Sequence, residues 1–247
     1  MAMTIFYVLF LCFLLTYEPI WGYISYQRFK QDIHKTPENK TRRIAYYKET
    51  MLALWIPTLI IVIVTMVSPI TFSSLGFSWP SLNTSIFGKW ISYILLALFV
   101  GYLFAIVYHF VAMKTSQAFR DKVANELENM PYQELLPESN QEKKLWGYVS
   151  LTAGVTEEII YRGFLLLVLT TLVPDASEWL YIVIAGIVFG LAHTYQGLSG
   201  FIRTTLIGIC FSMLYLILGS LFPLMIFHFL IDFVANASNS TTEGNKL

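Results

Sequence analysis

The apolar residues of this chain gather in seven long blocks separated by polar segments. The blocks occupy about residues 3–24, 51–67, 90–113, 146–173, 179–195, 201–218 and 221–235. A helix needs about 20 mostly apolar residues to cross the ~30 Å hydrocarbon core of a bilayer. Only 13% of the 247 residues are charged, whereas soluble domains carry about 25%. The sequence therefore predicts an all-α, polytopic helical membrane protein.

About seven transmembrane helices are expected, within a range of six to eight. The last two blocks could form one broken hairpin, and the first could lie at the membrane interface. Seven Lys and Arg residues against three acids make residues 25–49 the most basic connector. Cytoplasmic loops are enriched in Lys and Arg, so the N-terminus is expected outside and the C-terminus inside. Within the polar segment 114–144, we expect a surface helix that ends near Met130.

The fourth block contains three charged side chains within six residues: Glu157, Glu158 and Arg162. Each charge near the centre of a membrane helix costs about 2.5–3.5 kcal/mol on insertion scales, so such groups usually face a protein-lined interior and serve a function. Glu158 and Arg162 are four residues apart and share a helix face. Glu157 is rotated by about 100° and is freer to meet a different partner. The alternative is an architectural ion-pair cluster that joins helices.

The fifth and seventh apolar blocks each contain a histidine. His193 ends the fifth block, and His228 lies in the seventh, four residues before Asp232. Taken alone, either histidine is more typical of a hydrogen-bonded core residue than of a base or ligand. Inward-facing carboxylate and imidazole groups on three helices, however, make a plausible catalytic constellation.

Five further residues are expected to have no catalytic role. Glu18 is interpreted as a solvated acid near the membrane interface. His34 lies in the basic connector, and His109 has no acidic neighbour at helical spacing. Cys12 and Cys210 lie inside apolar blocks and are expected to be free and buried.

Several hydrolase motifs are absent, including H-E-x-x-H, G-x-S-x-G and a Gly-rich phosphate loop. Three other motifs are present: E-E-x-x-x-R at 157–162, F-x-x-x-H at 189–193 and H-x-x-x-[N/D] at 228–232. In this order, on successive apolar blocks, they resemble the motifs of the CPBP membrane proteins (the CAAX protease and bacteriocin-processing family, also called Abi). The resemblance covers about residues 146–235.

The resemblance implies a helical intramembrane endopeptidase. In eukaryotic and archaeal members the substrate is a prenylated C-terminal tail, whereas many bacterial members process or protect against peptides. Carried over by motif, Glu157 would be the general base that activates water, and His193 would assist it. His228 and Asp232 would stabilise the oxyanion, and the Glu–Arg pair would orient the site.

Asp232 departs from the family pattern, because many members have Asn at this position. An ionised Asp cannot donate a hydrogen bond to an oxyanion. Asp232 would therefore be protonated, hold His228 charged, or bind a metal. The sequence favours a site without cofactor and leaves a Zn²⁺ site open, with Glu157, His193, His228 and Asp232 as its ligands.

The chain is expected to form one integral domain with three parts. Residues 1–145 would supply N-terminal spans, the basic connector and the polar surface segment, residues 146–236 the CPBP-like catalytic core, and residues 237–247 a polar tail. The expected location is a bacterial cell membrane, with multiple passes. Its expected partners are the lipid bilayer and a peptide or membrane-protein substrate, but no nucleic acid. The alternatives are a non-catalytic immunity or regulatory scaffold of the same family, and a proton-relay transporter, for which no inverted repeat is visible.

Overall fold

The computed structural model describes residues 1–35, 40–128 and 130–239, and within these residues all regular structure is helical. In chain order the elements are α1 (Ala2–Thr16), η1 (Tyr17–Gly22), α2 (Tyr23–Lys35), α3 (Lys40–Val67), α4 (Lys89–Thr115), α5 (Gln117–Glu128), η2 (Gln133–Leu135), α6 (Asn140–Glu157), η3 (Glu158–Leu165), α7 (Leu166–Leu172), α8 (Glu178–Ala192), η4 (Thr194–Gln196), α9 (Gly197–Leu218) and α10 (Phe222–Asn239). The expected polar tail lies mostly outside the described residues, since α10 continues to Asn239.

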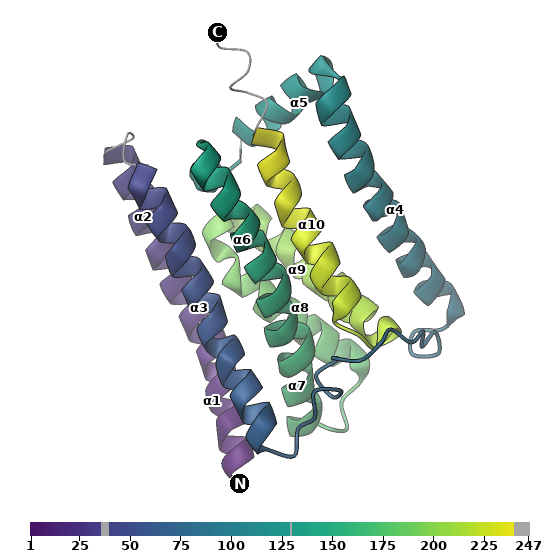
Figure 1. Ribbon diagram of the computed structural model, residues 1–247. Helices are drawn as coiled ribbons and strands as arrows, with labels where there is room; N and C mark the ends of the chain where they lie inside the picture. The colour runs from purple at the N-terminus through teal and green to yellow at the C-terminus, as the bar shows by residue number, and fades with distance from the viewer. Residues whose placement is uncertain (36–39, 129, 240–247) are drawn as a thin grey trace.

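The long helices stand side by side as in a membrane bundle (Figure 1). In the described part of the chain, four helical stretches are long and apolar enough to cross a membrane: Ala2–Lys35, Thr41–Val67, Lys89–Thr115 and Thr194–Leu218. Glu178–Ala192 and Phe222–Val234 are shorter apolar helices, and α6, η3 and α7 form the charged rod of the fourth block. The predicted polytopic helical membrane fold is confirmed.

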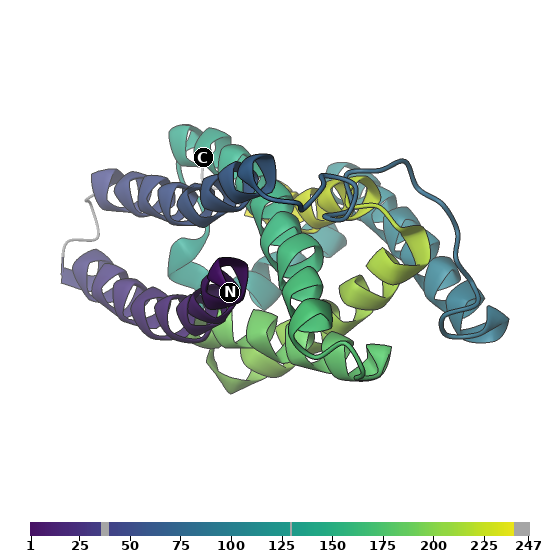
Figure 2. The same ribbon diagram turned by 90° about the horizontal axis from the view of Figure 1, so that it is seen from below.

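Viewed from below, the rod formed by α6, η3 and α7 runs through the middle of the bundle (Figure 2). It contacts α3 on one side and α10 on the other, and α8 packs closely on α9. The charged motif of the fourth block is therefore central, and its neighbours carry the other two motifs.

Helix α4 presents an apolar surface away from the bundle. Only 6% of its most apolar stretch is buried, and the side chains of Leu98 and Phe104 are 65% and 71% exposed. Such a surface suits contact with lipid rather than water. The two cysteines are free as expected, but Cys12 and Cys210 are both exposed on helix surfaces. The expectation that they are buried is wrong, because their apolar helices also face outward.

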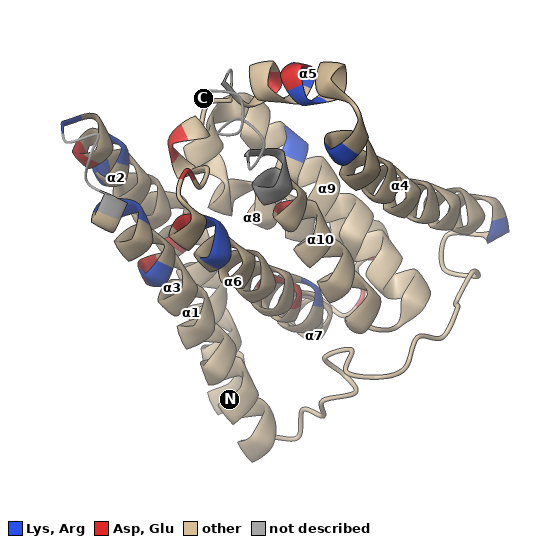
Figure 3. Ribbon diagram, turned by 45° about the horizontal axis from the view of Figure 1, so that its top comes forward, with Lys and Arg blue, Asp and Glu red and all other residues tan. Residues whose placement is uncertain are grey.

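Most Lys and Arg residues gather at one end of the bundle, on α2, α3, α5 and the start of α6 (Figure 3). By the positive-inside bias this end is expected at the cytoplasmic side. The basic connector is mainly helical, because α2 continues to Lys35 and α3 begins at Lys40. The surface helix predicted before Met130 is confirmed as α5, Gln117–Glu128.

A buried polar network fastens the start of α6 to α3. Arg43 is 4% exposed and donates hydrogen bonds to the Glu134 carbonyl (3.0 Å), Glu138 (2.8 Å) and Glu142 (3.2 Å). Glu142 is fully buried and also accepts the backbone N–H groups of Glu138 and Ser139, completing a capping box. Charge-assisted bonds of this kind are among the stronger ones in proteins. The network therefore fixes where α6 begins and orients the rod that follows.

Glycines let the site-bearing helices approach one another closely. A Cβ atom on Gly154 of α6 would lie 2.8 Å from the Phe229 amide nitrogen and 2.9 Å from the Met225 carbonyl oxygen of α10. A Cβ atom on Gly190 of α8 would lie 2.0 Å from the Thr205 hydroxyl of α9. Small residues at helix crossings are the usual means of close packing in membranes. These contacts bring α6 against α10 and α8 against α9.

Candidate active site

The three motifs meet at the centre of the bundle, on three separate helical rods. The acidic motif lies where α6 passes into the wide π-helical turn η3, which begins at Glu158. His193 caps the C-terminal end of α8, and His228 lies on α10. π-Helical turns inside α-helices occur frequently at functional sites. Here the wide turn carries adjacent carboxylates into the interior from a single rod.

Glu158 forms the structural centre of this cluster. Its side chain is fully buried, and its Oε1 atom lies 2.7 Å from His228 Nδ1 and 3.0 Å from Arg162 Nη1. The predicted pair between Glu158 and Arg162 is present. Arg162, 1% exposed, also lies over the rings of Phe189 (4.4 Å) and Phe211 (5.0 Å). Glu158 therefore joins the acidic motif to the His228 helix, and Arg162 joins it to α8 and α9.

Glu157 occupies a different environment, although it is the adjacent residue. It is 8% exposed, and its Oε2 atom lies 3.8 Å from His228 Nε2 and 4.0 Å from His193 Nε2. Both separations are too long for direct hydrogen bonds, and within the described residues Oε2 has no hydrogen-bond partner. Sequence spacing predicted a separate partner for Glu157. His193 fits that prediction, but His228 faces both glutamates.

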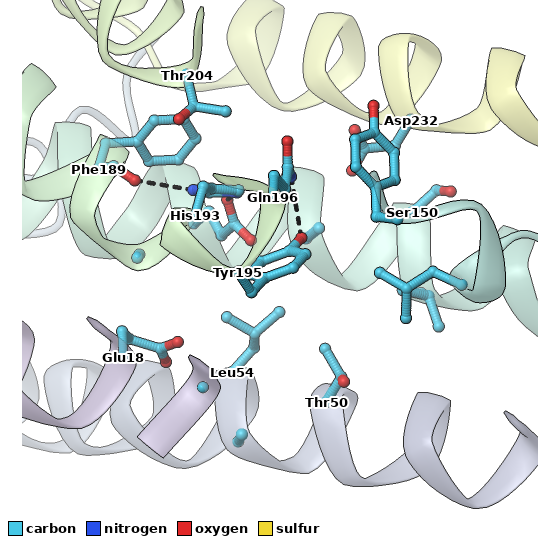
Figure 4. A pocket seen from close by; sticks show the side chains of 18 of the residues that line it. Glu18, Thr50, Leu54, Ser150, Phe189, His193, Tyr195, Gln196, Thr204 and Asp232 are labelled. Carbon is cyan, nitrogen blue, oxygen red and sulfur yellow. Dashed lines mark hydrogen bonds and ion pairs between the residues drawn. The ribbon is translucent and has the colours of Figure 1, made fainter. Parts of the chain in front are cut away.

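The orientation of His193 follows from one backbone contact. Its Nδ1 atom lies 2.8 Å from the Phe189 carbonyl oxygen, one turn earlier in α8 (Figure 4). A carbonyl only accepts, so Nδ1 carries the proton and Nε2 presents a lone pair when the ring is neutral. That lone pair faces the carboxylate of Glu157.

Asp232 lies at the edge of the cluster. Its Oδ2 atom is 3.7 Å from His228 Nε2, and its side chain is 35% exposed. Its backbone carbonyl accepts a hydrogen bond from the Trp146 indole at 3.0 Å, which ties α10 to α6. His228 is therefore held directly by Glu158 at Nδ1, while Asp232 faces its other nitrogen across a gap.

A cavity of about 820 Å³ opens beside the cluster, and Glu157, His193, His228 and Asp232 all line it. Binding pockets for small ligands usually span about 300–1,000 Å³. Its opposite wall is formed by η1 and α3, where Glu18, Thr50 and Leu54 face the space (Figure 4). The site is thus closed by the N-terminal half of the chain as well as by the three motif-bearing rods.

Glu18 was interpreted from the sequence as a solvated acid near the membrane interface. It lies near the middle of a helical stretch that runs without interruption from Ala2 to Lys35. The residue is half-buried and lines the cavity. An acid inside an apolar block, directly before a proline, was the signal that pointed to it.

The proposed zinc ligands do not form a closed set. As the side chains are arranged in the described part of the chain, no three His, Cys, Asp or Glu residues converge on a point that could hold a metal ion. Zinc sites in proteins need ligand atoms about 2.0–2.3 Å from the ion. The four side chains as placed therefore do not fit a bound zinc ion.

The comparisons with known proteins identify the same region of the chain. A family model described as type II CAAX prenyl endopeptidase Rce1-like matches residues 141–234. No curated protein and no solved structure matches the chain. The matched segment contains the three motifs and begins near the start of α6. Over residues 141–234, the chain is thus similar to the CAAX-protease-type membrane proteins that this family model describes.

Proposed function

We propose that this protein is an intramembrane endopeptidase that hydrolyses a peptide bond of a membrane-associated peptide or protein, using water activated by Glu157 and His193. One observation carries the proposal. The Oε2 atom of Glu157 has no hydrogen-bond partner among the described residues and faces the Nε2 atoms of His228 and His193 at 3.8 and 4.0 Å.

The spacing of these atoms suits a water molecule between them. Polar atoms separated by more than about 3.5 Å are commonly bridged by water. A water placed there would donate one hydrogen to Glu157 and the other to the lone pair of His193. Glu157 would take the proton as the oxygen attacks the scissile carbonyl, and would then pass it to the departing amine nitrogen.

His228 is the group best placed to stabilise the negative charge on the carbonyl oxygen. Its Nδ1–H donates to Glu158 at 2.7 Å. In the doubly protonated ring, Nε2–H then faces the cavity and is available to an oxyanion. Asp232, 3.7 Å from the same nitrogen, would favour that charged ring by Coulomb attraction. Of the three roles considered for Asp232, the geometry best supports holding His228 charged.

The decisive experiment compares neo-N-termini in native membranes that contain either the wild type or Glu157→Ala. Loss of a general base typically lowers the rate by about 100- to 10,000-fold. We expect one or a few cleavage products to disappear and their uncut precursors to accumulate. His193→Ala should give the same pattern.

The matched control is Glu178→Gln, which removes one negative charge at the exposed start of α8. This variant should retain the wild-type products. Membrane levels of all variants are measured in the same samples. Identical products from wild type and Glu157→Ala at equal protein levels would refute the proposal and favour the scaffold alternative.

A further inference from the structure

The cavity contains an ionisable group that the proposed chemistry does not use. Glu18 lies on the wall across from His193 and Phe189 (Figure 4). Glu157 and Tyr161 of the central rod and Tyr46 of α3 line the same cavity. Glu18 therefore faces the same space as the reactive groups, although it lies outside the three motifs.

Local structure holds Glu18 in this place. The helix widens into the π-helical turn η1 at Tyr17–Gly22, and Pro19 has no N–H with which to continue the α-helical pattern. Turn η1 contacts both α8 and η4, the turn directly after His193. Just before it, Phe10 of α1 packs edge-on against the fully buried Phe164 of η3, with ring centroids 4.8 Å apart. The Glu18 carboxylate therefore belongs to a helical segment that packs against the rest of the bundle.

Within the described residues, the Glu18 carboxylate forms no hydrogen bond or ion pair. Four arginines line the same cavity: Arg28 lies over the Trp21 ring, Arg203 donates to Tyr132 and Gln196, and the other two have carboxylate partners. Arg162 pairs with Glu158 at 3.0 Å. Arg42 pairs with Asp32 at 3.0 Å and with Glu49 at 3.2 Å. An uncompensated acid inside an apolar span is costly and usually marks a substrate or ion pathway. A cation that enters the cavity could therefore supply a countercharge that the neighbouring side chains do not.

We propose that Glu18 forms a substrate subsite that binds a basic side chain, Lys or Arg, of the peptide held in the cavity; this rests on the proposed endopeptidase function. The aromatic rings of Tyr46 and Tyr195 also line the cavity, and such rings attract cations through their faces. A basic side chain would meet both the carboxylate and this aromatic wall. Glu18 is accordingly a specificity residue, because the proposed chemistry at Glu157 proceeds without it.

Binding can be measured without hydrolysis in the Glu157→Ala protein, reconstituted in phosphatidylcholine nanodiscs. The probes are fluorescent apolar peptides of one host sequence, in which a single Lys or Gln is moved through each position. We expect the best Lys peptide to bind about 10- to 100-fold more tightly than its Gln partner, as for a hydrogen bond to a charged group. Adding Glu18→Gln should abolish this ratio, and Glu18→Asp should restore part of it.

Two further variants separate a specific subsite from a general charge effect. Glu49→Gln removes another acid of the same cavity, but one that is already paired with Arg42, and should leave the Lys-to-Gln ratio intact. Glu18→Lys should reverse the preference toward a peptide with Glu at the same position. Thermal melting of each reconstituted variant accompanies the titrations, and ratios are compared among variants that melt cooperatively.

The outcomes for Glu18 and for the protease proposal are distinct. A Lys preference that survives Glu18→Gln, or no Lys preference in the parent, overturns the subsite. A preference lost equally in Glu49→Gln also overturns it. If binding follows the expected pattern while the protein with Glu157 intact cleaves none of the peptides, the subsite stands and the endopeptidase proposal fails for these sequences.

Discussion

Glu157 and Glu158 are adjacent acids, and the structure assigns them opposite sensitivities to neutralisation. Glu158 is fully buried and holds Arg162, itself only 1% exposed. Glu158→Gln would leave the guanidinium buried without a countercharge. Removing one member of a buried ion pair typically destabilises a protein by about 3–5 kcal/mol. His228 would also lose its charged acceptor at 2.7 Å, so we expect a loss in that range.

Glu157→Gln should have a much smaller effect on stability. The nearest histidine nitrogens lie 3.8 and 4.0 Å from Glu157 Oε2, which has no hydrogen-bond partner among the described residues. Neutralising a buried charge without a close partner removes a desolvation cost, so we expect a change within about 1 kcal/mol, or a gain. Proteolytic activity should nevertheless be lost, because the proposed base is gone.

The assay is equilibrium unfolding of the purified protein in detergent, followed by tryptophan fluorescence, with a double-mutant cycle. Arg162→Met added to Glu158→Gln removes the orphaned charge, and should recover most of the lost stability. The coupling between Glu158 and Arg162 should therefore be large. The reasoning is refuted if Glu157→Gln destabilises as much as Glu158→Gln, or if the cycle shows no coupling.

Three further predictions concern packing, pH and metal. Gly154→Ala should destabilise the protein by about 1–3 kcal/mol and lower its activity, because the added Cβ would lie 2.8 Å from a backbone nitrogen of α10. Gly101→Ala is the control, since a Cβ there would have nothing within 4 Å. Unfolding measurements should find the stability of the control variant unchanged or slightly increased. Burial raises the pKa of the Glu134 carboxyl, but hydrogen bonds, led by that from Lys30 at 2.9 Å, outweigh it and lower the pKa below its usual value. The stability that Glu134 contributes is therefore present above pH ~4.3, the usual Glu pKa, and is lost as the pH falls through the lowered value. In Glu134→Gln, the free energy of unfolding should depend less on pH in this range. A pH dependence equal to that of the wild type would contradict the prediction. Treatment with EDTA should leave cleavage of a substrate intact, and elemental analysis of the same sample measures its metal content. A loss of activity that added Zn²⁺ restores would contradict the proposed hydrolysis without a metal.

The membrane fold could be predicted from the sequence because the signal is local. A block of apolar residues must satisfy its own backbone hydrogen bonds in lipid, and a helix does so without any partner. The pair formed by Glu158 and Arg162 was predictable for a similar reason, since four residues make almost one helical turn. The surface helix before Met130 and the membrane class followed from the same kind of evidence.

Contacts between helices depend on how the rods pack, and local periodicity does not contain that information. Regular spacing predicted different directions for Glu157 and Glu158, but the wide turn η3 and the close approach at Gly154 let the two nitrogens of His228 face both acids. The local pattern around Glu18 does not show that this residue lines the cavity, because the opposite wall is formed by residues far away in the chain.

The buried charges of the fourth block and the motif order were thus determined by the sequence alone, because insertion cost and helical spacing act within one segment. The cavity, the bridging position of His228 and the facing position of Glu18 were decided only by the tertiary structure. Each requires side chains from rods far apart in the chain to meet across a shared space. Their positions are therefore set by inter-helix packing rather than by the residues next to them.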